Sequence, residues 1–587
     1  LPKLDLIAIP DFAFGAMENW GAITFRENLL LHYPGVTSVA AEERICEVIA
    51  HEIAHQWFGN LVTPSDWKYL WLNESFATFL GFGILDHYYP EWRAWDHFSN
   101  TQTHTALERD ALHETFPIEI PGGEHVVINT GTAPIIYSKG GSILRQIEGY
   151  IGKDNFQKGL RHYLKTHEYG CASSHHFWEA FETVTEEPIT RMMKSWVGQP
   201  GFPVIQVDRI GSNLILNQKR FTYLPNDSEQ QWMIPVNITV IDNAGGSSTV
   251  KVLLEGSDVK VDIGDDVLAY KINSGQTGFY RVHYLDADNL AILGKRIADK
   301  TLPEQDRWGL QDDLFALVRS GDVSMAQYLD FLSYYENEDA YLPLVSIAGN
   351  LGHAQRVFRN PVKDKVASFG RALFERVLSD MGYTPVEHEP HTTSSLRDQL
   401  IWQAVVFGSE PATEFARDQF GVLTDGGSID ANIVKSVMQT GAHTGNRETF
   451  DWFVRRLETA DSEHDRLNVL SAMGCFQDPA LIDKSRAYAL EHVPDRNKSI
   501  PIVALAVNPI SAKSMWDWYV EHLDALEGCH PIIHERIIAG IVPLCGIAQS
   551  ETVRAFFNEY LKEKPWTKDV VRLSLEKLEI NVLMRAG

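Results

Sequence analysis

The chain has 587 residues, and its 52 basic against 78 acidic side chains give a net charge of −26. A surface this acidic repels nucleic acid and anionic membranes, which excludes both as partners. A chain of this length with 44% hydrophobic residues is predicted to form several domains, each large enough to bury a core.

The first 200 residues change from strand-like to helix-like sequence. Residues 1–40 contain the apolar runs LDLIAI and AITFRENLLL, separated by AFGAMENWG. From Ala41, apolar residues such as Ile45 and Ile49 recur at helical spacing, and this helix is expected to stop near Gly59. Further helices are predicted at 71–88, 137–151, 154–166 and 174–184.

The remainder of the chain divides into a strand-like region and a helix-like region. Between about 203 and 285, short alternating runs such as MIPVNITVI are punctuated by Asn, Asp and Gly, which is typical of a small β-sandwich. From about 290 onwards the sequence is helical throughout, which favours an α-superhelix without a strict sequence repeat. We therefore predict a multidomain α+β protein with domains at 1–202, 203–288 and 289–587.

The stretch His51-Glu52-Ile53-Ala54-His55 lies inside the first predicted helix. Positions four apart share one helical face, so both imidazoles can bind one zinc ion, while Glu52 can reach a water on that ion. Glu74, nineteen residues beyond His55 in WLNESFATF, adds a carboxylate from a second helix. A catalytic zinc site needs three protein ligands and one open position, and His51, His55 and Glu74 meet that need with one ion per chain.

The competing interpretation is that His51 and His55 are ordinary core histidines and that Glu74 is a helix-surface carboxylate. Other histidine pairs do not offer a comparable site. His530 and His534 are four apart, but Pro531 follows the first of them and no carboxylate does. If zinc is bound, it polarises a scissile carbonyl, and Glu52 takes a proton from water and passes it to the leaving amine.

Four motifs, GAMENW, HEIAHQW, WLNESFA and YSKG, occur in this order along the chain. Together with GFPVI and the helical C-terminal region, they resemble the gluzincin aminopeptidases of the aminopeptidase N type. The resemblance covers the whole chain. It implies a thermolysin-like catalytic domain, a β-sandwich and a superhelical domain, and it implies a zinc-dependent enzyme that removes the N-terminal residue of peptides.

The resemblance also implies roles for individual residues. It assigns substrate binding to Gly15, Ala16, Met17, Glu18 and Asn19. Glu18 would pair with the free α-amino group of the substrate, which penalises blocked termini. Gly15 and Ala16 would present backbone groups to the peptide as an added strand. Tyr137, in YSKG, would donate its hydroxyl to the oxyanion; without the resemblance it would be interpreted as a core aromatic residue.

This chain departs from the family in three respects. The segment INTGTAPIIYSKG, which contains Tyr137, stands where the family commonly has an acidic, Phe-containing stretch, so we expect a different local pocket shape. WLNES replaces the frequent WLNEG, and we expect Ser75 to alter packing only. The family's N-terminal domain would precede Leu1, so we expect a fragment or processed form, or a separate chain that supplies the missing part. Alternatives to an aminopeptidase are therefore a catalytically silent peptide-binding scaffold, a fragment active only on complementation, and a zinc endopeptidase or epoxide hydrolase on the same scaffold.

The five cysteines are scattered and contain no CxxC pair, which indicates neither a disulfide framework nor a zinc ribbon, although Cys529 and Cys545 could pair. No segment approaches the roughly 18 apolar residues of a membrane helix. The N-terminal sequence has neither the basic lead nor the cleavage site of a signal peptide. We therefore expect a cytoplasmic protein without a membrane segment.

Overall fold

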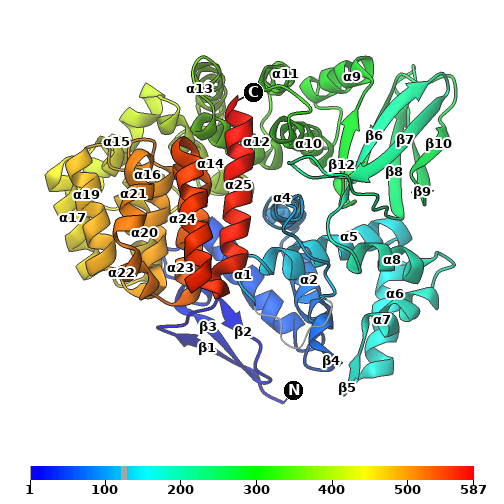
Figure 1. The fold of residues 1–587 in the computed structure, drawn as a ribbon, viewed down its shortest axis with the longest axis horizontal. Coiled ribbons are helices and arrows are strands. Elements are labelled where there is room, and N and C mark those ends of the chain that lie inside the picture. The colour runs from blue at the N-terminus through cyan, green and yellow to red at the C-terminus, as the bar shows by residue number, and fades with distance from the viewer. Residues whose placement is uncertain (1, 121–127, 587) are drawn as a thin grey trace. The chain divides into compact units, whose positions relative to one another are not determined.

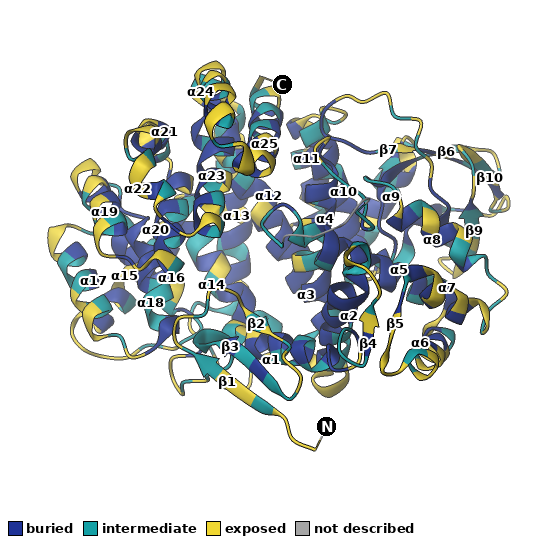
Figure 2. Ribbon diagram, turned by 60° about the horizontal axis from the view of Figure 1, so that its bottom comes forward, coloured by how far each residue is buried: buried dark blue, intermediate teal, exposed yellow. Residues whose placement is uncertain are grey.

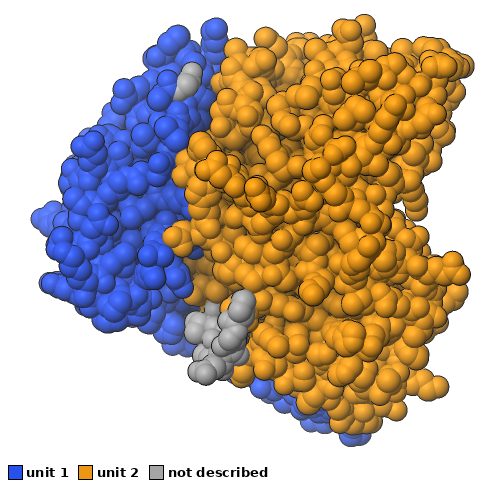
Figure 3. Space-filling model, turned by 45° about the vertical axis from the view of Figure 1, so that its right-hand side comes forward, with its two compact units in different colours: residues 1–49, 347–587 blue, residues 50–346 orange. Residues whose placement is uncertain are grey.

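The computed structural model describes residues 2–120 and 128–586. The chain forms two compact units, residues 1–49 with 347–587 (the first unit) and residues 50–346 (the second unit), shown in blue and orange in Figure 3. The described residues form a mixed α+β fold with small sheets and a large helical C-terminal part (Figure 1).

The first unit opens with a three-stranded sheet in the order β1-β3-β2. β1 (Asp5–Ile9) runs parallel to β3 (Ala22–Arg26), and β2 (Ala16–Met17) pairs antiparallel with β3. Ile23 and Phe25 are fully buried because alternate residues of β3 point to the same face. The sheet therefore holds the GAMEN segment at its edge, anchored by β3.

α1 (Val39–Ala54) links the two units, because the division between residues 49 and 50 falls within it. It ends five residues earlier than the sequence predicts. The chain leaves the helix in a turn in which the Asn60 N–H donates to the His55 carbonyl, 3.0 Å away. Gly59 makes this turn possible, because its φ is +122° and a Cβ there would lie 2.1 Å from Asn73 Oδ1.

The C-terminal helices of the first unit pack as a layered array. One row of helices packs each against the next, in the order α14, α16, α18, α20, α23 and α25. The intervening helices pack beside this row (Figure 1). The array comprises α13 (Val362–Met381), α14 (His391–Val406), α15 (Glu410–Thr424), α16 (Val434–Thr444), α17 (Arg447–Thr459), α18 (Glu463–Met473), α19 (Pro479–Glu491), α20 (Asp495–Val507), α21 (Ala512–Glu521), α22 (Leu523–Glu527), α23 (Pro531–Cys545), α24 (Ser550–Glu563) and α25 (Lys568–Ala586).

The second unit is built around a buried helix, α2 (Trp71–Tyr88), drawn largely in dark blue in Figure 2. Buried side chains surround its first half on all sides, so it lacks the single apolar stripe of a surface helix. Around it lie α3 (Ala94–Phe98), α4 (His104–Asp110), α5 (Gly140–Ile151), α6 (Lys153–His167), α7 (Ser174–Glu182) and α8 (Ile189–Val197), and the short parallel pair β4 (Val62–Pro64) and β5 (Gly170–Ala172).

Two small sheets follow in the second unit, in the orders β10-β7-β6-β12 and β11-β8-β9. Their strands are β6 (Pro203–Ile210), β7 (Asn213–Arg220), β8 (Ile234–Ile241), β9 (Ser247–Leu254), β10 (Asp258–Asp262), β11 (Ala269–Ile272) and β12 (Arg281–Tyr284). α9 (Ala287–Ala298), α10 (Glu304–Ser320), α11 (Met325–Leu332) and α12 (Tyr341–Val357) come next, and α12 crosses into the first unit. Buried Arg281 joins β12 to α10 through ion pairs with Asp312 and Asp313.

All five cysteines are free, so Cys529 and Cys545 do not pair. Among the described residues, no single helix has the length and apolar content needed to cross a membrane. One bent pair, Pro531–Cys545 with Ile547–Glu563, passes that test only when taken together, at an angle of 67°.

Candidate metal centre and active site

The three predicted metal ligands converge in the second unit. His51 and His55 extend from the last turns of α1, and Glu74 lies in the first turn of α2. Glu74 Oε2 is 3.4 Å from His51 Nε2 and 3.3 Å from His55 Nε2, and the two Nε2 atoms are 3.0 Å apart. Within residues 2–120 and 128–586, every group of three side chains close enough to share an ion contains His55.

These distances fit a zinc ion. Tetrahedral zinc with bonds of about 2.0–2.2 Å places neighbouring ligand atoms about 3.3–3.6 Å apart, close to the two separations from Glu74. The other ring nitrogen of His55, Nδ1, donates to the Phe58 carbonyl at 3.1 Å. Because a carbonyl only accepts, this bond fixes the tautomer that leaves the Nε2 lone pair free for a metal.

The charge state of Glu74 also suits a metal ligand. Burial disfavours its ionised form, but the hydrogen bonds and charges of His51 and His55 outweigh burial and hold the pKa of the Glu74 carboxyl well below its usual range. The group is therefore a carboxylate at neutral pH, as a zinc ligand must be.

The proposed base and oxyanion donor lie beside this cluster. Glu52 is buried on α1, and one of its carboxylate oxygens is within 4.8 Å of a ring nitrogen of His55. Tyr137 lies on a short π-helical turn, η5 (Pro134–Lys139), and its ring stacks on His51 with centroids 6.0 Å apart. π-turns inside helices occur often at functional sites.

Neighbouring elements fix the turn that carries Tyr137, and sequence reasoning did not identify these contacts. Ser75 Oγ donates to the Ile136 carbonyl at 2.5 Å. Ser138 Oγ donates to Gln102 Oε1 at 2.7 Å. Lys139 pairs with Asp110 at 2.9 Å, and both side chains are fully buried. A lysine within an otherwise apolar helical stretch signals such a buried partner, but the sequence does not say which carboxylate it is.

The predicted substrate-binding segment, residues 15–19, lies in the first unit. β2 is the last strand of its sheet, so within the described residues one of its edges has no neighbouring strand. The Arg26 N–H donates to the Gly15 carbonyl at 2.9 Å, and Asn19 closes the turn by accepting from the Ala22 N–H at 3.0 Å. Glu18 follows β2 directly, and its approach to the metal ligands stays a prediction.

Comparison with known proteins agrees with this arrangement. The profile of the peptidase family M1 domain matches residues 1–196, and that of the ERAP1-like C-terminal domain matches residues 269–580. A probable aminopeptidase 2 from Sulfurisphaera tokodaii is 32% identical over 568 residues, which are 96% of this chain and 69% of the relative.

Further relatives come from distant organisms. Aminopeptidase M1 of Arabidopsis thaliana is 30% identical over 99% of this chain and 68% of its own length. The Tricorn protease-interacting factor F2 of Thermoplasma volcanium is 32% identical over 99% of this chain and 71% of its own length. The chain belongs to peptidase family M1, and it is a hydrolase of the aminopeptidase type.

Substitution of a residue in the cluster of His51, His55 and Glu74 should lower the zinc content of the protein. His55→Ala removes the central ligand, so zinc bound after dialysis should fall from about one ion per chain to a small fraction of that. Elemental analysis measures this without any assay of activity. His175→Ala, which removes an exposed histidine paired with Glu179, is the matched control and should keep its zinc. Equal zinc in both variants would show that the metal lies elsewhere.

Proposed function

We propose that this chain is a zinc-dependent aminopeptidase that hydrolyses the N-terminal peptide bond of peptides. The observation that carries the proposal is the convergence of two imidazoles and one carboxylate within 3.0–3.4 Å. This is the ligand set of hydrolytic zinc sites, which keep one position open. A zinc ion held there supplies a Lewis acid that polarises the scissile carbonyl and lowers the pKa of water.

The chain's own residues would carry the remaining steps. Glu52 takes the proton of the attacking water and delivers it to the leaving amine. Tyr137 donates its hydroxyl hydrogen to the oxyanion that forms as the carbonyl is attacked. The stacking of Tyr137 on His51 supports this role, because it keeps the phenol next to a metal ligand.

The GAMEN segment would recognise the substrate's free end. A peptide can add to the open edge of β2 as a further strand, with Gly15 and Ala16 in contact with its backbone. Glu18 pairs with the α-ammonium group, so the first peptide bond alone lies at the zinc. The substrates we propose are therefore peptides with a free N-terminus.

The proposal also includes the fold type of each domain. We infer a thermolysin-like domain, a β-sandwich from the two sheets of the second unit, and a superhelix from the helical rows of the first unit. A separate chain that supplies an N-terminal domain, and a cytoplasmic location, remain part of the same proposal.

The rival functions differ in what they need from the site. A silent scaffold needs neither Glu52 nor a metal, whereas all six predicted catalytic, ligand and amine-binding side chains are present here. An endopeptidase gains nothing from Glu18, because an internal peptide bond offers no ammonium group nearby.

Glu52→Gln should retain zinc and lose turnover by about 10²–10⁴-fold, because the amide cannot accept the water proton. Turnover of amino-acid amide fluorogenic substrates and elemental analysis of the same preparation test both statements. A variant that keeps zinc and near-normal turnover would remove Glu52 as the base. Loss of turnover on addition of a zinc chelator to the unmodified protein should accompany this result.

Glu18→Gln should lower kcat/KM for free-amine substrates by about 10–100-fold, because one charge-assisted hydrogen bond is lost. The unmodified protein should leave the N-acetylated forms of the same substrates intact. Glu27→Gln, on the neighbouring turn, is the control and should cleave at the normal rate. Cleavage of N-acetylated peptides at comparable rates would identify an endopeptidase and contradict amine recognition.

A further inference from the structure

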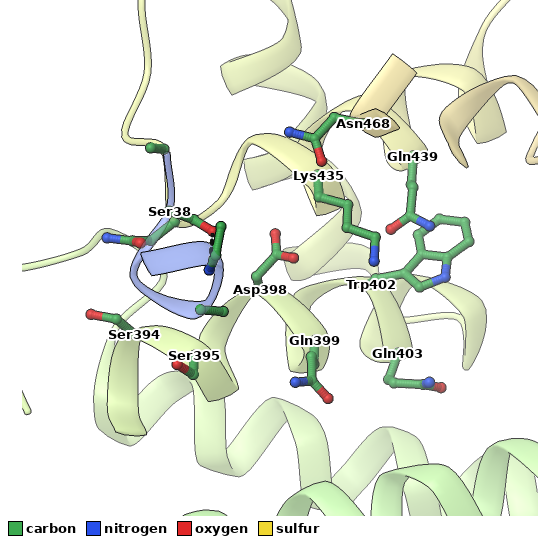
Figure 4. A pocket seen from close by; sticks show the side chains of 14 residues that line it. Ser38, Ser394, Ser395, Asp398, Gln399, Trp402, Gln403, Lys435, Gln439 and Asn468 are labelled. Carbon is green, nitrogen blue, oxygen red and sulfur yellow. Dashed lines mark hydrogen bonds between the residues drawn. The ribbon is translucent and has the colours of Figure 1, made fainter. Parts of the chain in front are cut away.

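A polar pocket that contains none of the proposed metal ligands lies in the first unit. It has a volume of about 480 Å³ and is lined by α14, α16, one residue of α18 and the start of α1 (Figure 4). Sites for small molecules commonly measure about 300–1,000 Å³, so this pocket has room for one small ligand and water.

The pocket holds one acidic and one basic side chain. Figure 4 shows Asp398 of α14 and Lys435 of α16 extending into the same space, and the end of Lys435 lies beside the Trp402 ring. Among the described residues the two head groups form no ion pair with each other. Asp398 Oδ1 accepts from the Ser436 N–H at 2.9 Å.

Two polar side chains of this pocket, half-buried Asp398 and buried Ser395, can gain from a bound ligand. Burial raises the pKa of the Asp398 carboxyl, although Lys435 and the hydrogen bonds of Ser436 partly oppose the rise. Ser395 is 7% exposed and lines the pocket, and its Oγ has no hydrogen-bond partner in the described part of the chain. Such groups gain free energy when a ligand supplies the missing charge or hydrogen bond.

The other residues that line the pocket exclude several classes of ligand. Amide side chains, among them Gln399, Gln403 and Gln439, carry no charge and both donate and accept hydrogen bonds. With one acid and one base the pocket is electrically balanced, so it favours neither a phosphate nor a cation. A single aromatic side chain, Trp402, gives too little apolar surface for a lipid.

We propose that this pocket binds a free α-amino acid as its zwitterion, with the ammonium group at Asp398, the carboxylate at Lys435 and the side chain along Trp402. In every α-amino acid the ammonium and carboxylate groups are attached to the same carbon atom, so one small ligand carries a charge of the right sign for each of the two side chains. Free amino acids are the products of the proposed reaction. The inference that the pocket binds a product of this enzyme rests on the proposed function, whereas the binding of an amino acid does not.

Equilibrium dialysis with isotope-labelled L-alanine tests the proposal. The unmodified protein should bind L-alanine saturably, and Asp398→Asn and Lys435→Met should each weaken that binding at least about tenfold. Asparagine still accepts from the Ser436 N–H, and Lys435 is exposed, so both variants should fold. Lys562→Met removes another exposed lysine and should bind normally.

Two modified ligands test the ammonium group and the carboxylate of the amino acid one at a time. N-acetyl-L-alanine lacks the ammonium group and L-alaninamide lacks the carboxylate, so both should bind at least about tenfold more weakly than L-alanine at this pocket. Unchanged L-alanine binding in both variants, or equal binding of the two blocked ligands, would overturn the proposal. Peptide turnover is measured on the same variants and should be near normal, so failure of the pocket and failure of the proposed function give different results.

A second observation, independent of the pocket, concerns Ser75. This residue directly follows the ligand Glu74 on α2, is fully buried, and donates to the carbonyl of Ile136, the residue before Tyr137. A Cβ on Gly140 would lie 1.9 Å from Ser75 Oγ, so the two helices meet closely at this point. The expectation that Ser75 affects packing alone is therefore incomplete.

We infer that Ser75 is a positioning residue that holds the Tyr137 hydroxyl at the zinc ligands. The inference rests on the proposed function, because it assumes that Tyr137 stabilises the oxyanion. Ser75→Ala should lower kcat about tenfold with little change in KM, since the misplaced hydroxyl affects the transition state and not ground-state binding. Ser195→Ala, which removes another serine bonded to a carbonyl, should change neither constant.

A double-mutant cycle with Tyr137→Phe distinguishes positioning from a general loss of structure. Tyr137→Phe alone should lower kcat about 10²–10³-fold, and Ser75→Ala should then have no further effect. An undiminished effect of Ser75→Ala in the Tyr137→Phe background would overturn the positioning role. Normal kcat of Tyr137→Phe alone would instead refute the oxyanion role and thus that part of the proposed function.

Discussion

The proposed metal site depends on the way the end of α1 is held against the start of α2. Two histidines on one helix provide only two ligands, so the third must arrive from a different element within about 3.5 Å. The turn at Gly59 achieves this approach, because it lets the chain pass within contact distance of Asn73, the residue before Glu74. A side chain at Gly59 would collide with the Asn73 side chain and would be strained at this positive φ, so the turn depends on glycine.

A second set of buried contacts fixes the chemistry around these ligands. The turn η5 is tied to α2 by Ser75, and to the rest of the unit by the buried pair of Lys139 with Asp110. Leaving either member of a buried pair without its partner is costly, so these contacts constrain η5 strongly. Rigid support of this kind is what a hydroxyl needs if it is to meet an oxyanion without rearrangement.

The two units contribute different kinds of function. The second unit holds the proposed metal ligands, the proposed base and Tyr137, and the first unit holds the GAMEN edge strand and the polar pocket of Asp398 and Lys435. Placing an amino-acid site on the helical array would let product concentration act on the molecule without occupying the zinc ligands. In the array each helix packs mainly on its neighbours.

The sequence by itself predicted the proposed metal ligands and the proposed base. Helical spacing places His51 and His55 on one face wherever the helix lies, and the need for a third ligand pointed to Glu74, whereas the role of Tyr137 came from the family resemblance. Only the tertiary structure decided the partners of Ser75 and Lys139, and the placing of Asp398 and Lys435 in the lining of one pocket. These contacts join residues distant along the chain, and which surfaces meet is set by packing that no local pattern encodes.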